Sequence, residues 1–252
     1  MAGQPPDGVR PFWLTAFLDF APDEFGAGTA FWRAATGYGI SPFRGEASEF
    51  ATLVPTGGDE YLKVQRLGSG LTRLHLDVHV PDPWAAAEAA ERAGAVLVDE
   101  SRHSYVVLRS PAGFTFCLVS QPASVVPPVA RWESGHRSRV SRFCLDVPHK
   151  RYAAEVAFAQ CLLGGPWREL VEPGTALRPA GDLPLDVRLQ PAEFASEVST
   201  HLHVITDDLA AEVDRLVALG ARRRAVRTSK AILEAPGGMV LCVVALEAAA
   251  FA

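Results

Sequence analysis

The sequence predicts an α+β fold built from two similar domains in tandem, because the chain repeats itself. The segment around His75 (LHLDVHVPD) lies over the segment around His201 (HLHVITDD) at an offset of +126. The segment 110–119 (SPAGFTFCLV) lies over 235–244 (APGGMVLCVV) at +125. Each half also contains two successive units of strand, helix and three short strands. Self-similarity at one offset is the mark of a duplicated architecture, so we expect four βαβββ modules in two pairs.

Start and stop signals mark one helix in each module. Asp82-Pro83 is a cap followed by a first-turn proline, and Asp208 is a second cap. The predicted helices end at glycines, which tolerate the left-handed conformation that closes a helix. They are expected over 25–36, after Pro83, over 151–163 and after Asp208, and they stop at Gly37, Gly94, Gly164 and Gly220.

The predicted strands alternate between apolar and polar residues or form short apolar runs. They begin at Trp13 and continue in EFATLVP, YLKVQR, LHLDVHV, AVLVDE, SYVVLRS and FTFCLVS, and later around Val226, Ile232 and Val243. The third module has the weakest pattern. Its segment 172–186 is rich in proline and glycine, and we expect a loop there in place of a strand.

A proline-rich segment separates the halves. Residues 122–136 contain three prolines and no periodicity, which is typical of a linker. The sequence therefore predicts domains at 10–121 and 137–247.

Composition excludes several classes of protein. The 24 Lys+Arg and 29 Asp+Glu give a net charge of −5 without long runs of one sign, which argues against nucleic-acid or anionic-membrane partners. The four cysteines all lie in apolar stretches, and no 18-residue apolar segment or signal-peptide pattern is present. We expect buried thiols, a cytoplasmic protein, a small-molecule ligand as its partner, and a monomer or weak homodimer.

Two local patterns carry a resemblance to a known family. Each half ends in P-x-G-x-x-x-C, through Cys117 and Cys242, and R-x-H-x-D runs from Arg73 through His75 to Asp77 before the helix cap. With the four modules, these patterns resemble the vicinal-oxygen-chelate superfamily, in particular its glyoxalase-like and bleomycin-resistance proteins. The resemblance implies two half-open mixed-sheet barrels, each around one pocket.

The resemblance also implies positions for metal ligands on the first and last strands of each module. They map to Thr15 or Ala16, Gln65, His75 and Cys117 in the first half, and to Arg142 or Phe143, Gln190, His201 and Cys242 in the second. The metalloenzymes of the superfamily use His or Gln, Glu, His and Glu. Both carboxylates are missing from these positions, so we expect no conventional metal and no other cofactor. If a divalent metal is bound, the ligands are Gln65, His75 and Cys117, and Gln190, His201 and Cys242.

His75 and His201 are the candidate catalytic residues. Each is interpreted as a general base or pocket-facing hydrogen-bond donor oriented by Gln65 or Gln190, or else as a structural histidine bonded to that glutamine. Alternation places Arg73, His75 and Asp77 on one face, where an ion pair is the alternative to a ligand contact. The remaining candidates for ligand binding are Phe17, Tyr61 and Arg142, with the reservation that strand aromatics are more often core residues.

The sequence leaves three functions open. The first is a protein that binds a small, partly apolar metabolite or antibiotic without a conventional metal, for sequestration, resistance or metal-independent turnover. The second is a divalent-metal-dependent lyase, isomerase or dioxygenase. The third is a non-catalytic scaffold whose pocket is filled by side chains. Fold alone does not decide among them.

Overall fold

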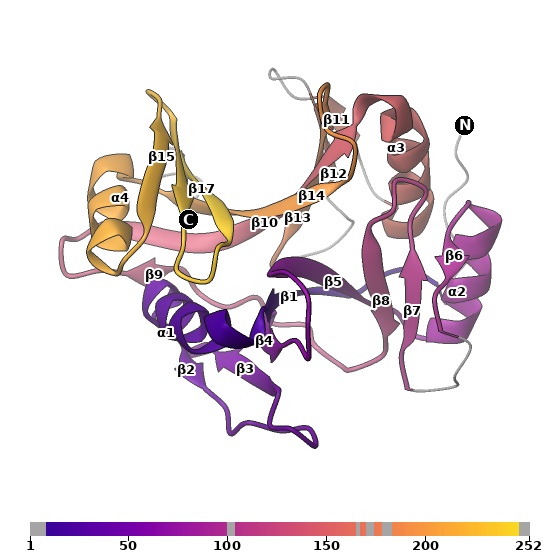
Figure 1. Cartoon of the computed structure of the whole chain (residues 1–252), viewed down its shortest axis with the longest axis horizontal. Coiled ribbons are helices and arrows are strands. Elements are labelled where there is room, and N and C mark those ends of the chain that lie inside the picture. Colours follow the sequence, from indigo (N-terminus) through magenta and orange to yellow (C-terminus); the bar gives the residue numbers. More distant parts are fainter. Residues whose placement is uncertain (1–8, 100–103, 165–166, 170–173, 178–182, 247–252) are drawn as a thin grey trace. The chain divides into compact units, whose positions relative to one another are not determined.

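A computed structural model describes residues 9–99, 104–164, 167–169, 174–177 and 183–246, and it confirms the α+β fold with four βαβββ modules (Figure 1). The first half consists of β1 (Trp13–Phe20), η1 (Pro22–Glu24), α1 (Phe25–Thr36), β2 (Gly39–Ile40), β3 (Phe50–Val54), β4 (Leu62–Arg66), β5 (Arg73–His79), α2 (Pro83–Arg92), β6 (Val96–Leu97), β7 (Val106–Arg109) and β8 (Thr115–Val119).

The second half repeats this plan after a linker strand, β9 (Ala130–Arg131). It consists of β10 (Arg137–Pro148), α3 (His149–Leu163), β11 (Trp167–Glu169), β12 (Thr175–Leu177), β13 (Asp186–Ala192), β14 (Ser199–Thr206), α4 (Leu209–Ala218), β15 (Arg222–Val226), β16 (Lys230–Glu234) and β17 (Val240–Ala245).

The two sheets have the same strand order. One runs β2-β3-β4-β1-β5-β8-β7-β6 and the other β11-β12-β13-β10-β14-β17-β16-β15, so the duplication holds strand by strand. Both sheets are mixed. The pairs β5–β8 and β14–β17 are parallel, with Asp77 opposite Cys117 and His203 opposite Cys242. The outer hairpins are antiparallel.

The predicted helix caps form as expected. The carboxylate of Asp82 accepts hydrogen bonds from the backbone N–H groups of Trp84 and Ala85 at 3.0 and 3.1 Å. The carboxylate of Asp208 accepts one from Ala211 at 3.0 Å. These bonds satisfy N–H groups that have no partner inside the helix, and each cap stabilises its helix by about 1 kcal/mol.

Two segments contain more structure than the sequence indicated. The stretch 172–186, expected to be a loop, includes strand β12, which pairs with β13 through Thr175 and Leu189; residues 172–173 and 178–182 lie outside the described residues. The linker includes β9, which pairs with β10 through Arg131 and Arg137. Partner strands supply the hydrogen bonds in both places, and local sequence patterns carry no information about them.

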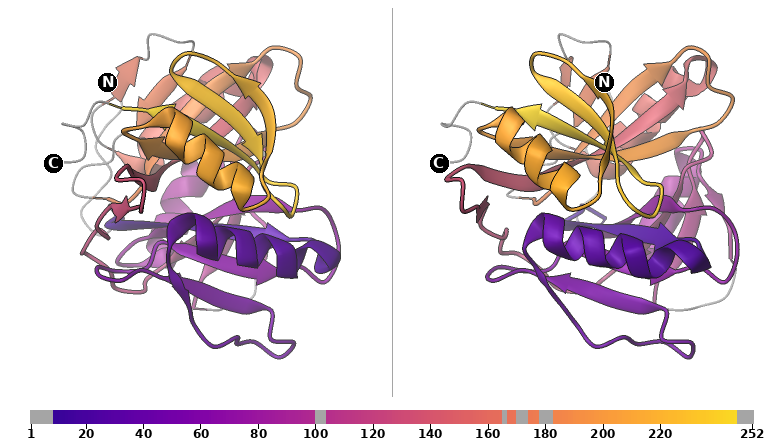
Figure 2. Two further views of the ribbon diagram at one scale, coloured as in Figure 1. Left: turned by 90° about the vertical axis from the view of Figure 1, so that its left-hand side faces the viewer. Right: turned by 60° about the vertical axis from the view of Figure 1, so that its left-hand side comes forward.

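The chain divides by compactness into two units, and each takes segments from both halves of the sequence. Unit 1 comprises 1–16, 75–126 and 143–200, whereas unit 2 comprises 17–74, 127–142 and 201–252. Unit 1 therefore holds helices α2 and α3. Unit 2 holds α1 and α4, with α4 packed against β16 and β17 (Figure 2).

Two further findings concern membrane-spanning helices and the cysteines. No helix among the described residues is long and apolar enough to cross a membrane. All four cysteines are free thiols; Cys144 and Cys242 are buried as the sequence predicted, whereas Cys117 and Cys161 are partly exposed.

Candidate functional site

Strand β5 carries polar side chains on one face and apolar side chains on the other. Leu74, Leu76 and Val78 are buried on one side of the strand. His75 and Asp77 alternate with them and therefore point to the opposite side. This face of β5, together with its parallel neighbour β8, forms the candidate site of unit 1.

His75, Asp77 and Cys117 meet on that face. Cys117 lies opposite Asp77 in the parallel register, so the two side chains point the same way. The donor atoms of the three side chains all lie within 4.8 Å of one another, and His75 Nε2 is 3.5 Å from Asp77 Oδ1. The side chain of His75 is 13% exposed and that of Asp77 is 8% exposed. An imidazole, a carboxylate and a thiol are thus gathered on one face, and the imidazole is slightly more exposed than the carboxylate.

The thiol of Cys117 is held in its neutral form. Burial raises the pKa of Cys117, and the nearby negative charge of Asp77 raises it further, whereas the hydrogen bond from His75 acts in the opposite direction. A thiolate is the form that attacks electrophiles or binds metals. Cys117 is therefore a weak nucleophile on its own and needs a cation beside it to lose its proton.

His79, the next residue on this face, has a structural role. Its Nδ1 lies 2.7 Å from the carbonyl oxygen of Gln121, and its Nε2 lies 2.9 Å from Oγ1 of Thr15. A carbonyl oxygen only accepts, so Nδ1 carries a proton, and Nε2 shares a hydrogen bond with the threonine hydroxyl. Thr15, one of the first-strand positions considered for a ligand, is thereby committed to His79.

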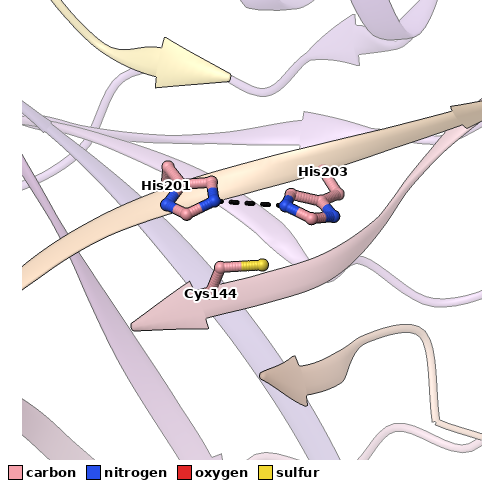
Figure 3. A group of neighbouring side chains, drawn as sticks. All are labelled: Cys144, His201 and His203. Atoms are coloured by element: carbon pink, nitrogen blue, oxygen red, sulfur yellow. Dashed lines mark hydrogen bonds between the residues drawn. The ribbon is translucent and has the colours of Figure 1, made fainter. Parts of the chain in front are cut away.

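The second half places a pair of histidines at the equivalent position. His201 and His203 lie on β14 with their Nε2 atoms 3.1 Å apart, as the dashed line in Figure 3 marks. One of these nitrogens donates and the other accepts, so at least one ring is neutral. His203 takes the place of Asp77 in the repeat and lies opposite Cys242 in the β14–β17 register. Figure 3 also labels Cys144, a buried thiol from strand β10.

Arg73 and Phe17, two of the predicted ligand-binding residues, have partners within unit 2. The guanidinium of Arg73 lies 3.4 Å from the carboxylate of Asp19. The ring of Phe17 is buried, and the ammonium group of Lys63 lies 5.3 Å from its centroid. Arg73 shares a face with Asp77 by alternation, but it forms an ion pair with Asp19.

The other predicted ligand-binding residues lie on different segments of the chain. Tyr61 is fully buried, and its hydroxyl donates to the carbonyl of Val140 at 2.9 Å. Burial raises the pKa of Tyr61 well above its usual value, so it stays protonated. Arg142 is buried on β10. Gln65 and Gln190 are half-buried on β4 and β13, and their predicted role in orienting the histidines stays a prediction.

Sequence reasoning did not count Asp77 or His203 among the possible metal ligands, although it placed Asp77 on the face of His75 and named it for ligand contact. Asp77 was assigned to ligand contact or to an ion pair; its carboxylate lies within 4.8 Å of the donor atoms of His75 and Cys117, although Asp77 is not one of the positions mapped from the family. His203 was seen only as the residue that replaces Asp77. Because the period of a strand is two residues, both positions share a face with the predicted histidine.

Comparisons with known proteins place the chain in a family. The sequence profile of the glyoxalase-like domain matches residues 15–119 and again residues 142–244. The chain therefore belongs to the glyoxalase-like domain family and has the vicinal-oxygen-chelate fold. Among curated proteins, no sequence matches this chain.

Solved structures share the fold at low sequence identity. The Mn(II)-bound glyoxalase from Novosphingobium aromaticivorans is 20% identical with a TM-score of 0.65, over 94% of this chain and 82% of that one. The 2,3-dioxygenase LapB from Pseudomonas sp. KL28 is 11% identical with a TM-score of 0.63, over 94% and 92%. A halotolerant catechol dioxygenase is 12% identical with a TM-score of 0.58, over 94% and 88%.

Proposed function

We propose that this chain binds a small, partly apolar molecule with adjacent oxygen atoms, and that His75, Asp77 and Cys117 are its polar contacts. The observation that carries the proposal is the convergence of three titratable side chains within 4.8 Å on one face of two paired strands. Polar groups that converge on an accessible face fix the orientation of a ligand, whereas apolar walls supply the affinity.

Within this group the residues have different roles. The imidazole of His75 is the group that exchanges a proton with a bound molecule, since its ordinary pKa is nearest to neutrality. Asp77, 3.5 Å from His75 Nε2, acts as a positioning residue that orients the ring. Cys117 is neutral while its pKa is raised and serves as a weak donor.

A divalent metal fits the same three residues. In a tetrahedral zinc site, ligands at about 2.0–2.3 Å from the ion are roughly 3.3–3.8 Å apart, and the His75–Asp77 separation of 3.5 Å falls in that range. Imidazole, carboxylate and thiolate together favour Zn²⁺ over harder ions such as Mn²⁺. His75, Asp77 and Cys117 would hold the ion, which would polarise an oxygen atom of the bound molecule. This donor set differs from the conventional one of the superfamily.

With zinc at this unconventional site, the metal-dependent alternative is a lyase or isomerase; a dioxygenase would need a redox-active ion held by the same residues, because Zn²⁺ has no redox chemistry. The catechol dioxygenase and the manganese glyoxalase among the structural neighbours support the general idea of an oxygen-bearing substrate beside a metal. In unit 2, His201 and His203 supply two imidazoles, which alone are fewer ligands than zinc requires.

Metal analysis and ligand titration together test the proposal. Tag-free protein is analysed for bound metal and titrated with Zn²⁺ and then with catechol, a probe with adjacent oxygens, in the wild type and in His75→Ala. We expect catechol binding to weaken at least tenfold in His75→Ala. His149→Ala, which removes an exposed histidine outside the cluster, is the matched control.

The outcomes separate the candidates. Catechol binding that requires His75 but not Zn²⁺ supports metal-free binding. Stoichiometric zinc that is lost in both His75→Ala and Cys117→Ser supports the zinc enzyme. Catechol binding that is the same in His75→Ala and in the wild type overturns the assignment of this face as the ligand site.

A further inference from the structure

The opposite face of strand β5 borders a pocket that the proposed function does not use. It contains about 370 Å³ of empty space, part of it open to solvent, within unit 1. Its walls come from β5, β8, β10, β13 and helix α3, namely Leu76, Val78, Phe114, Phe116, Leu145, Glu155, Phe158, Ala159, Leu162, Leu163, Val187 and Leu189. Because Leu76 and Val78 alternate with His75 and Asp77, this pocket and the His75 face lie on opposite sides of the strand.

The repeat shows what fills the corresponding space in unit 2. At an offset of 127 residues, Ala159 of helix α3 corresponds to Trp32 of helix α1. The indole of Trp32 is fully buried and packs edge-on against Phe31, with ring centroids 5.6 Å apart. Unit 1 keeps the equivalent phenylalanine, Phe158, but the residue that follows it, Ala159, has a methyl group in place of the indole. The pocket is thus located where the other unit places an indole ring.

A second exchange enlarges this difference. In unit 2 the ring of Phe20 lies directly on Gly28, so close that an added Cβ would be 2.2 Å from Phe20 Cε1. The residues of unit 1 at these positions are Val147 and Glu155. Unit 1 therefore has an alanine and a valine where unit 2 has two aromatic residues, and a glutamate where unit 2 has a glycine.

Among the described residues that line the pocket, Glu155 is the only ionisable one, and it is 2% exposed. Its Oε2 accepts a hydrogen bond from the backbone N–H of Ala112 at 2.8 Å, and the hydroxyl of Ser110 also bonds it. Burial raises its pKa against both hydrogen bonds. Two carboxyl oxygens have about four lone-pair sites, so these two bonds leave capacity for another donor.

The purely structural explanation is that Glu155 only anchors the β7–β8 turn. Arg151, one helical turn away, donates to the carbonyl of Ala112 at 3.0 Å, so both polar groups of this residue are held by α3. That role explains the bond to Ala112. It does not explain the space beside Ala159, which an apolar side chain could fill at a gain in stability.

We propose that the pocket of unit 1 is a second binding site, which takes a planar aromatic molecule of indole size with its N–H or O–H directed at Glu155. The size of the ligand is inferred from the repeat, because Ala159 stands where unit 2 has the indole of Trp32. The apolar walls select a flat hydrocarbon ring, and the buried carboxyl group selects a donor on its edge. The inference is independent of the function proposed for the His75 face.

Titration with indole tests this proposal, with binding measured by calorimetry and by the shift in melting temperature. Ala159→Trp supplies from the protein the ring that the ligand would supply, so we expect indole binding to weaken at least tenfold. Ala157→Trp makes the same change on the exposed side of the same helix and should bind indole like the wild type. If Ala159→Trp does not fold, Ala159→Leu fills part of the space and should show a smaller loss in the same direction.

The donor is tested with indene, which has the shape of indole without the N–H. Wild-type protein should prefer indole to indene, and Glu155→Gln should reduce that preference because a neutral amide is a weaker acceptor. His75→Ala should leave indole binding unchanged, which separates this site from the proposed function. Indole binding that is absent from the wild type, or equal in the wild type and both Ala159 variants, overturns the proposal.

Discussion

The carboxylate of Glu212 lies 2.8 Å from Nε2 of His136, and both side chains are almost completely buried in unit 2. The same carboxylate accepts hydrogen bonds from Ser138 at 3.0 Å and twice from Arg215 at 2.8 Å. Arg215 stacks on Trp132 and donates to the carbonyl of Ala35 at 2.7 Å. One carboxylate on α4 thus connects the linker segment, strand β10 and, through Arg215, the end of helix α1.

Removal of that carboxylate should strongly destabilise the protein. Glu212→Ala leaves Arg215 and His136 buried without their shared partner, and breaking a buried pair in this way costs about 3–5 kcal/mol. Urea unfolding at neutral pH measures the loss. The control is Glu88→Ala, since Glu88 is exposed and its pair with Arg92 at 4.0 Å contributes less than about 1 kcal/mol. Equal effects of the two substitutions would contradict this account of unit 2.

The thiol of Cys117 should titrate at a lower pH once Asp77 loses its charge. Burial is the largest cause of its raised pKa, and the carboxylate of Asp77 is a further one. Asp77→Asn removes only the second cause, so the midpoint of iodoacetamide labelling against pH should fall while the thiol stays buried. Mass spectrometry of the peptide that contains Cys117 measures the midpoint. An unchanged or higher midpoint would show that Asp77 does not act on the thiol.

Glu155 should make the protein less stable as the pH rises from acid to neutral. Its pKa is raised in the folded state, so the native protein holds this proton more tightly than the unfolded chain. The stability from the protonated form is present below the unfolded pKa and is lost as the pH rises through the folded pKa. Glu155→Gln cannot lose a proton. The free energy of unfolding of this variant minus that of the wild type should therefore be larger, meaning a relatively more stable variant, at pH 7 than at pH 4. Parallel urea titrations at both values test the sign, and a difference that does not depend on pH would contradict it.

The local features of the fold could be predicted because they depend on local physics. Asp82 and Asp208 cap helices because their side chains reach N–H groups two or three residues away. Helix α1 ends before Gly37, whose φ of 72° is readily adopted by a residue without a Cβ. The repeat allowed each assignment to be transferred from one half to the other. The two observed strand orders agree, as a duplicated chain requires.

The pairing of elements across the two halves could not be predicted in this way. The compact units combine the second module with the third and the first with the fourth, and the bond from Glu155 to Ala112 is one of the contacts that hold unit 1 together. No local pattern shows that a helix of one half will bind a turn of the other. For the same reason, strand alternation placed Asp77 on the face of His75, whereas the approach of Asp77 to Cys117 on the neighbouring strand emerged only from the structure.

In unit 2, the indole of Trp32 occupies the position that corresponds to Ala159 beside the pocket of unit 1. Removal of this indole should create an equivalent void. Its indole is fully buried, and no hydrogen-bond partner for its Nε1 is found among the described residues, so its contribution is packing. Trp32→Ala should therefore cost about 3–5 kcal/mol, as expected when a large buried aromatic side chain is truncated. Trp32→Phe keeps a ring in place and should cost clearly less. Added indole should occupy the void and restore part of the stability of Trp32→Ala, by about 2.7 kcal/mol at a concentration 100 times its Kd. The comparison is made in the Ala159→Trp background, so that the pocket of unit 1 does not contribute. A cost below about 1 kcal/mol would mean that the space collapses around the alanine, and the indole of Trp32 would then not be what keeps this part of unit 2 filled.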